Sequence, residues 1–199
     1  REWGFTDVPF PVARIDSLNT GVYSFVEGQK IAAAELSDAQ LLAIAAHLAK
    51  LHGFSKTDAS RPHPDAVMPA FSFADVYGLI DERMGPYLAA DGAPLDARIA
   101  RFLAETRVIP HIQDLLSDFR RRVGDRFHRR IDPEHICLSY GDIGAHNMLW
   151  DSDGAMVVLD LEYGGWDHPL RPIANTLAHE GMIDLPAHRK RFWADAYLR

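Results

Sequence analysis

One stretch decides how this sequence is interpreted: Leu138-Ser139-Tyr140-Gly141-Asp142-Ile143-Gly144-Ala145-His146-Asn147, which is followed by Val157-Val158-Leu159-Asp160-Leu161-Glu162. An apolar run leads into a polar loop that contains Asp142 and Asn147. A second apolar run then ends at Asp160. Between the two runs, Asp151-Ser152-Asp153-Gly154 is rich in turn formers, so a hairpin is predicted there. Such a hairpin would return Asp160 to the side of Asn147.

The order and spacing of these side chains suit phosphoryl transfer from a nucleotide. That reaction needs a carboxylate to orient the attacking hydroxyl and oxygen ligands to hold Mg²⁺ on the phosphates. In the protein-kinase catalytic loop the Asn also stands five positions after the Asp, and a metal-binding Asp follows on a later hairpin. Asp142, Asn147 and Asp160 fit these three places. Each one alone is explained as well by a turn or a strand end, but the set favours catalysis.

The region resembles the aminoglycoside phosphotransferase and choline kinase family, in which a His-Gly-Asp…Asn loop precedes an Asp-x-Glu or Asp-x-Asp strand. The segment Asp160-Leu161-Glu162-Tyr163-Gly164-Gly165-Trp166-Asp167-His168-Pro169 is most similar to choline-kinase-like members. The resemblance covers residues 136–180 and, less closely, 8–53. It implies an ATP- and Mg²⁺-dependent phosphotransferase with a protein-kinase-like fold. The acceptor would be a hydroxyl of a small molecule: a choline-like amino alcohol, an amino sugar, a sugar or an aminoglycoside.

The resemblance implies a role for each polar residue of the stretch. Asp142 would be the catalytic residue that orients the acceptor hydroxyl and takes its proton. Asn147 and Asp160 would hold Mg²⁺ and, through it, the nucleotide phosphates. Glu162 would share a strand face with Asp160 and bind metal directly or through water. His146 would either orient Asp142, contact phosphate or simply pack within the loop.

A hinge is expected near the start of the sequence. Residues 8–15 and 22–26 are extended in character and flank a run of turn formers, so they predict a β-hairpin. By the resemblance, this segment would link two lobes, and its backbone would meet the adenine at Ser24, Phe25 and Val26. An ordinary hairpin explains the residues themselves equally well.

The fold class expected is α+β and mainly helical: a kinase-like C-terminal lobe with a short hinge hairpin and a catalytic-loop hairpin. Residues 1–30 would be a remnant of the N-terminal lobe with the hinge, and residues 31–199 the helical lobe. Nothing before residue 8 resembles a Gly-rich phosphate loop, and no strand Lys is paired with a helix Glu. The N-terminal lobe is therefore expected to be largely absent here and present in the complete protein, and the fragment alone is expected to turn over poorly.

Helical periodicity accounts for most of the remaining chain. Ser37 is a good N-cap for a helix that ends near Gly53. The further helical patterns cover residues 72–90 and 95–123, separated at 91–94, with Pro110 kinking or dividing the second, and then the segments after Pro172 and after about Leu185. By the resemblance, the insertion at 72–123 would help shape the acceptor pocket through Asp75, Asp81 and Glu82. A solvated helix face explains these three acids as well.

Composition limits the possible classes of protein. With 47% hydrophobic and 25% charged residues, the 199-residue chain is typical of one globular domain. No apolar run approaches the ~18 residues that a membrane helix needs, so no membrane partner is expected. The net charge of −7 argues against nucleic-acid binding and is compatible with a cationic substrate. The single cysteine excludes an internal disulfide and favours a reducing compartment such as the cytoplasm.

Some positions depart from the family pattern. Tyr140 replaces the His that precedes Gly-Asp, and Gly144 stands where many members have His. Many members also have an Asp that braces the loop from the following helix. Here Pro172 takes that register, and Asn175, one turn later, is a possible substitute. A second hypothesis is therefore a catalytically inactive kinase-like module that binds a partner or nucleotide. A metal-dependent hydrolase, a third, would need further His or acid ligands.

Overall fold

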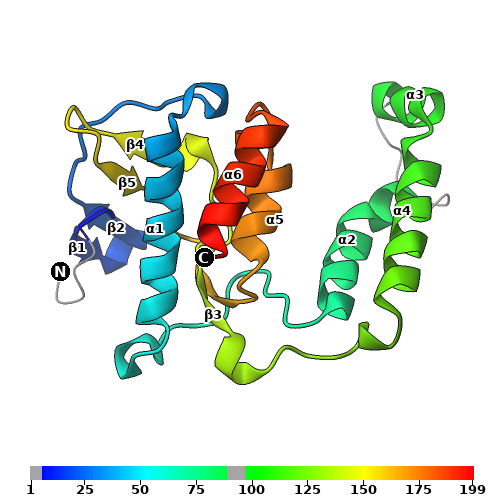
Figure 1. Ribbon diagram of the computed structural model, residues 1–199, viewed down its shortest axis with the longest axis horizontal. Coiled ribbons are helices and arrows are strands. Elements are labelled where there is room, and N and C mark those ends of the chain that lie inside the picture. The colour runs from blue at the N-terminus through cyan, green and yellow to red at the C-terminus, as the bar shows by residue number, and fades with distance from the viewer. Residues whose placement is uncertain (1–5, 89–96) are drawn as a thin grey trace. The chain divides into compact units, whose positions relative to one another are not determined.

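The computed structural model describes residues 6–88 and 97–199, so the break predicted at 91–94 lies outside the described residues. The chain forms two compact units (Figure 1). The first, here called the core unit, combines the segments up to Pro69 and from His135 to Arg199. The second, called the helical unit, runs from Ala70 to Glu134. Each unit is described by itself.

Helix α1, Asp38–Phe54, is the central helix of the core unit. It begins with a capping box, because the Ser37 side chain accepts from the Gln40 N–H and the Gln40 side chain accepts from the Ser37 N–H, at 3.2 and 2.7 Å. One face of the helix is buried through Leu41, Ile44 and Leu48. The predicted N-cap is confirmed, and the helix passes through Gly53 to end at Phe54.

Two short antiparallel strand pairs carry the segments around the predicted catalytic loop. Strand β4, Met148–Trp150, pairs with β5, Met156–Val158, and this confirms the predicted hairpin. In its turn, the Asp151 side chain accepts the backbone N–H groups of Asp153 and Ala155 at 2.9 and 2.8 Å. Strand β3, Cys137–Ser139, pairs instead with β6, Gly165–Asp167, which the sequence did not predict.

The predicted N-terminal hairpin is present. Strands β1, Pro11–Ile15, and β2, Thr20–Tyr23, pair antiparallel through a turn in which Asn19 is left-handed with φ 47°. Ser24 extends the pairing by one step, since its N–H donates to the Phe10 carbonyl at 2.7 Å and its hydroxyl accepts the Phe10 N–H at 2.9 Å. All residues of both strands are exposed.

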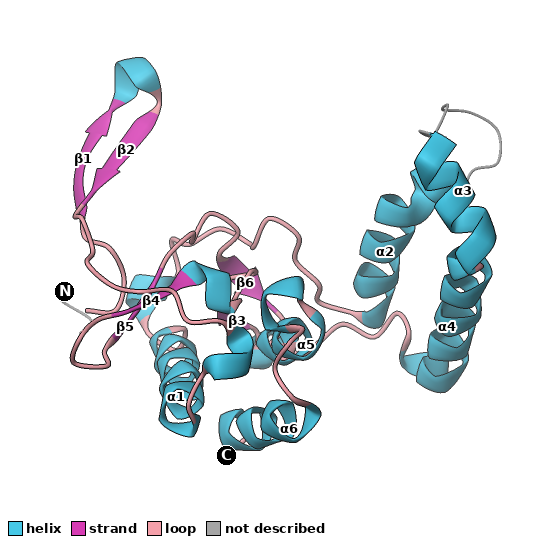
Figure 2. Ribbon diagram, turned by 90° about the horizontal axis from the view of Figure 1, so that it is seen from above, coloured by secondary structure: helices cyan, strands magenta, loops and turns pink. Residues whose placement is uncertain are grey.

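Two C-terminal helices complete the core unit (Figure 2). Helix α5 spans Arg171–Ala178, and Pro172 lies in its first turn, where its missing N–H costs nothing. Helix α6 spans Ala187–Tyr197 and packs against α1. Its Trp193 side chain is fully buried in the core that α1 also lines. Burying an aromatic ring of this size is worth several kcal/mol, of the order of 3–5 by truncation to Ala.

The helical unit contains α2, Phe73–Leu88, α3, Ala97–Thr106, and α4, Val108–Val123. Arg107 is left-handed with φ 51° and divides α3 from α4, so Pro110 stands in the first turn of α4, as the predicted division requires. Asp75 accepts the Phe71 N–H at 2.8 Å at the start of α2. Asp81 and Glu82 are exposed on α2.

Across the two described segments, every helix is too short or too polar to pass through a lipid bilayer.

A buried ion pair stabilises the core unit beside β6. Asp167 is completely buried; one of its oxygens accepts the Arg171 Nε–H at 2.8 Å and the other accepts the His168 N–H at 2.7 Å. A terminal nitrogen of Arg171 donates to the Met68 carbonyl. Breaking one partner of a buried pair leaves the other charge without compensation, which is costly.

We therefore expect Asp167→Ala to lower the free energy of unfolding by about 3 kcal/mol. The matched control is Asp58→Ala, because Asp58 pairs with Arg61 at the surface, where both side chains are at least 80% exposed. Its loss should stay below about 1 kcal/mol. Urea unfolding of the two variants measures the difference, and equal losses would contradict the assigned role of the buried pair.

Candidate active site

Position 141, in the loop that follows β3, can be occupied only by glycine. Its φ is +73°, a left-handed conformation that side chains disfavour. A Cβ atom at this position would lie 2.7 Å from the carbonyl oxygen of Tyr163 and 2.9 Å from its Cβ. The loop before Asp142 and the segment after Asp160 are therefore in direct backbone contact.

Helix α5 braces the same loop through a side chain. The Asn175 Nδ2 donates to the Gly141 carbonyl, one residue before Asp142. The substitute that the sequence suggested for the absent helix Asp therefore does contact the loop. It meets a backbone acceptor, a role that its amide N–H group can fill and that an ionised carboxylate cannot.

Tyr140, in the position where the family has His, is held by a buried histidine. Its hydroxyl lies 2.6 Å from Nε2 of His47 on α1, and the two rings stack with centroids 5.3 Å apart. The other ring nitrogen of His47 contacts the Asp7 carboxylate. Burial, with a further contribution from the negative charge of Asp7, raises the pKa of Tyr140, so the phenol stays neutral. The sequence did not point to His47, because 93 positions separate it from its partner.

A backbone hydrogen bond joins the segments of Asn147 and Asp160. The Leu159 N–H donates to the Asn147 carbonyl at 2.8 Å, which puts Asp160 directly beyond this bond. Asn147 is buried, with 6% of its surface exposed. Asp160 is exposed and left-handed with φ 58°, a conformation that costs a non-glycine residue of the order of 1 kcal/mol and concentrates at functional sites.

Nearby negative charges raise the pKa of the Tyr163 hydroxyl. Its pKa is raised first by the negative charge of Glu162 and a hydrogen bond to that side chain, and then, after a contribution from burial, by Asp160 and Asp142. Three of the predicted site acids thus act on one phenol. The Gly141–Tyr163 contact and the Leu159–Asn147 bond join the segments that carry Asp142, Asn147, Asp160 and Glu162.

The donor atoms in this region suit Mg²⁺. Asn147 offers an amide oxygen, and Asp160 and Glu162 offer carboxylate oxygens, which are the ligands a hard divalent cation prefers. The Asn147 Nδ2 is buried and has no hydrogen-bond partner within the described parts of the chain. Leaving a buried amide unsatisfied is costly. A cation on its oxygen together with an anionic group beside its nitrogen would satisfy it, so the residues fit a metal–phosphate ligand.

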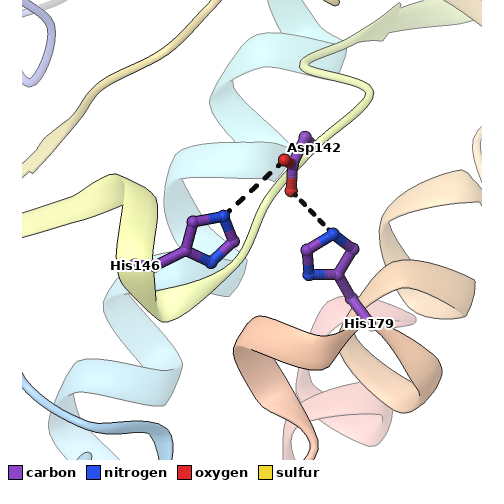
Figure 3. Close-up of side chains that lie close together, drawn as sticks. All are labelled: Asp142, His146 and His179. Carbon is purple, nitrogen blue, oxygen red and sulfur yellow. Dashed lines mark ion pairs between the residues drawn. The ribbon is translucent and has the colours of Figure 1, made fainter.

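Two histidines flank the Asp142 carboxylate (Figure 3). Nε2 of His179 lies 3.3 Å from Oδ1, and Nε2 of His146 lies 3.7 Å from Oδ2. The two imidazoles stack with centroids 5.3 Å apart and planes 10° from parallel. His146 was among the residues that the sequence placed near Asp142. His179 was missed, because nothing in its spacing marks it: it follows the short helix α5 and is brought back only by the fold.

The predicted adenine contacts, Ser24, Phe25 and Val26, lie at the end of β2. The side chain of Phe25 is 88% exposed. Shortly after them, Gln29 exchanges backbone hydrogen bonds with Trp150 of β4 at 2.8 and 3.0 Å. The segment predicted to be the hinge is therefore tied to the same hairpin that follows Asn147, and its role and its contact with a nucleotide stay predictions.

Comparison with known proteins identifies the family of the chain. A model described as the phosphotransferase enzyme family matches residues 6–199. No curated protein sequence matches the chain. Among solved structures, a spectinomycin phosphotransferase in complex with ADP and spectinomycin has a TM-score of 0.69 at 14% identity, covering 100% of this chain and 60% of that one.

Two other solved structures extend the comparison. An ADP-bound aminoglycoside phosphotransferase gives a TM-score of 0.61 at 17% identity, with 97% of this chain and 60% of that chain covered. A choline kinase from Streptococcus pneumoniae gives 0.54 at 14% identity, with 98% and 57% covered. Identities this low show a common fold, and the chain spans about 60% of the length of these structures. With the family model matched over residues 6–199, the chain belongs to the phosphotransferase enzyme family.

Proposed function

We propose that this chain is the catalytic and substrate-binding lobe of an ATP-dependent phosphotransferase that acts on a hydroxyl of a small molecule. The observation that carries the proposal is the close backbone approach of Gly141, which precedes Asp142, to Tyr163, which follows Glu162. The bond that fixes Asn147 to the residue before Asp160 supports it. The order of these residues along the chain matches the parts that phosphoryl transfer requires.

In this proposal, Asp142 accepts a hydrogen bond from the acceptor hydroxyl and takes its proton late in the reaction. The transition state of phosphoryl transfer is loose, so positioning matters more than strong basicity. Asn147 and Asp160 would hold Mg²⁺, with Glu162 as a further ligand, and the ion would neutralise phosphate charge when bound. The carboxylate of Asp142 is half-buried, with 24% of the side chain exposed, so an acceptor from solvent can reach it.

The nucleotide would use two parts of the chain. The backbone at Ser24, Phe25 and Val26 would meet the adenine, and the metal residues would meet the phosphates. Because the chain spans about 60% of the length of the solved phosphotransferases, we assign the cover over the γ-phosphate and its lysine to an N-terminal lobe of the complete protein. Residues 1–30 would be the end of that lobe and its hinge, and residues 31–199 the helical lobe.

The solved structures and the charge of the chain support a proposal for the acceptor class. Those proteins are named for spectinomycin, aminoglycoside or choline, all of which carry a hydroxyl group and a nitrogen that is cationic at neutral pH. The net charge of −7 also suits a cationic acceptor. We therefore propose an amino alcohol, an amino sugar, a sugar or an aminoglycoside.

A catalytically inactive kinase-like module is the second candidate. Pro172 favours it, because it removes the helix Asp that braces the loop in many members. The Asn175 contact with Gly141 weighs against it, since the loop is braced by another side chain. The two candidates differ in whether Mg²⁺ and ATP bind together and whether phosphate is transferred.

Binding is tested by thermal unfolding of the complete protein with Mg²⁺ and ATP. At an ATP concentration about 100-fold above Kd, ligand binding adds about 2.7 kcal/mol of stability. Each kcal/mol shifts the Tm of a domain of 150–250 residues by about 2–4 °C, so the Tm of the lobe that holds the site should rise by about 5–10 °C. The shift should need Mg²⁺ and should be lost in Asp160→Ala.

The matched control for that experiment is Asp195→Ala, which removes an exposed acid on α6 and should keep the full shift. A Tm that neither nucleotide nor metal changes in the unsubstituted protein would reject the nucleotide site. If the Tm shift were kept in Asp160→Ala, the metal would not be bound by this residue.

Transfer is tested with a panel of hydroxyl acceptors and labelled ATP. Asp142→Asn keeps the size of the side chain but loses its capacity to take a proton, so we expect kcat to fall about 10²- to 10⁴-fold. The Mg²⁺–ATP shift of Tm should remain, because Asp142 is not assigned to the metal. An unchanged transfer rate in Asp142→Asn would show that this residue has no role in the reaction.

A further inference from the structure

The Asp142 carboxylate has one oxygen that the chain does not satisfy. Oδ1 is buried and has no hydrogen-bond partner within the described residues. The polar atom facing it is Nε2 of His179, at 3.3 Å (Figure 3). This separation is slightly longer than a normal N–H···O hydrogen bond. Catalytic hydrogen bonds are often long in unliganded proteins and shorten when substrates bind.

The backbone determines which nitrogen of His179 carries the proton. His179 caps the short helical turn Glu180–Met182, and its Nδ1 accepts the Gly181 N–H at 3.1 Å. A nitrogen that accepts a hydrogen bond carries a lone pair, so the proton of a neutral imidazole must be on Nε2. The N–H group of His179 therefore faces Asp142.

The position of the His179 ring is also fixed by packing. His146 stacks on it with the rings 10° from parallel. A Cβ at Gly144 would lie 2.5 Å from the His146 ring, and a Cβ at Gly181 would lie 2.1 Å from it. Both glycines leave the space that the stacked pair of imidazoles occupies. The ring is consequently held on one face by stacking and at one nitrogen by the backbone.

The same three side chains could in principle hold a transition metal, since their ligand atoms lie within 4.8 Å of one another. A metal on Nε2 of His179 would require the proton to sit on Nδ1. Histidine ligands normally donate that second N–H to an acceptor. Here Nδ1 faces a donor, the Gly181 N–H, so this arrangement opposes a metal and suits a hydrogen-bond donor.

We propose that His179 is a positioning residue for Asp142: its Nε2–H holds Oδ1, which leaves Oδ2 for the acceptor hydroxyl. The inference rests on the proposed function, because it assigns Asp142 to the transfer step. Holding one oxygen fixes the rotation of the carboxylate. The direction in which Oδ2 can accept a hydrogen bond from the acceptor hydroxyl is then fixed as well. A displacement of about 1 Å at such a group can cost about 100-fold in rate.

The kinetic test uses two amide variants of His179, Gln and Asn, which differ only in the length of the side chain. The amide nitrogen of Gln can occupy the place of Nε2, whereas that of Asn corresponds to Nδ1 and stops short of Asp142. In the complete protein we expect His179→Asn to lower kcat about 10- to 100-fold with KM for ATP unchanged. His179→Gln should recover most of that loss. His188→Asn, an exposed histidine on α6, is the control and should keep wild-type rates.

Two kinetic results would overturn the proposal. Equal losses in His179→Gln and His179→Asn would mean a packing role that any substitution disturbs. Wild-type rates in both would mean that Asp142 needs no partner. A rise in KM for ATP at constant kcat would place His179 at the nucleotide and would also contradict the assignment.

A second readout does not depend on activity. The ¹⁵N chemical shifts of the His179 ring distinguish a proton on Nε2 from one on Nδ1, and we expect Nε2. The Nε2 signal should change in Asp142→Asn and not in Asp195→Ala. A proton on Nδ1, or Zn²⁺ binding that both His179 variants abolish, would overturn the proposal. If no acceptor is phosphorylated but the proton is on Nε2, the proposed function fails while the contact stands.

Discussion

The close approach of two backbones, at Gly141 and Tyr163, is the constraint on which the site depends. The left-handed φ and the 2.7 Å that a Cβ would leave to the Tyr163 carbonyl allow only glycine there. This contact brings the loop that carries Asp142 onto the segment that follows Asp160. Without it, the two acids would belong to separate loops that are joined through the β4–β5 hairpin and the β3–β6 pairing.

Several elements hold this pair of segments in place, each by a different kind of interaction. Helix α1 contributes His47, which binds and stacks on Tyr140. Helix α5 contributes Asn175, which binds the Gly141 carbonyl, and the turn after it contributes His179 beside Asp142. Strands β3 and β6 pair next to the contact, with Ser139 opposite Gly165. The loop residues themselves supply little regular structure, so the surrounding helices determine their geometry.

Local chemistry made much of this architecture predictable. Ser37 and Gln40 form a capping box, and Asp151 with Gly154 forms a turn, because side chains bond backbone groups a few positions away. The family was indicated by the order and spacing of Asp142, Asn147 and Asp160, which are also local in the sequence. Long-range contacts were not predictable. Strand β6 has three residues and is defined by pairing with β3 and by a bridge to Asp65, both distant in sequence. Neither His47 nor His179 has a neighbour in sequence that reveals its partner.

We propose that the side-chain oxygens of Asn147 and Asp160 bind one divalent ion beside Asp142. The most direct measurement is the anomalous scattering of Mn²⁺, in place of Mg²⁺, in crystals of the complete protein with ATP. We expect a peak about 2 Å from both oxygens, with phosphate oxygens completing the shell. A peak held by Asp142, His146 and His179, or none near Asp160 when ATP is bound, would contradict it.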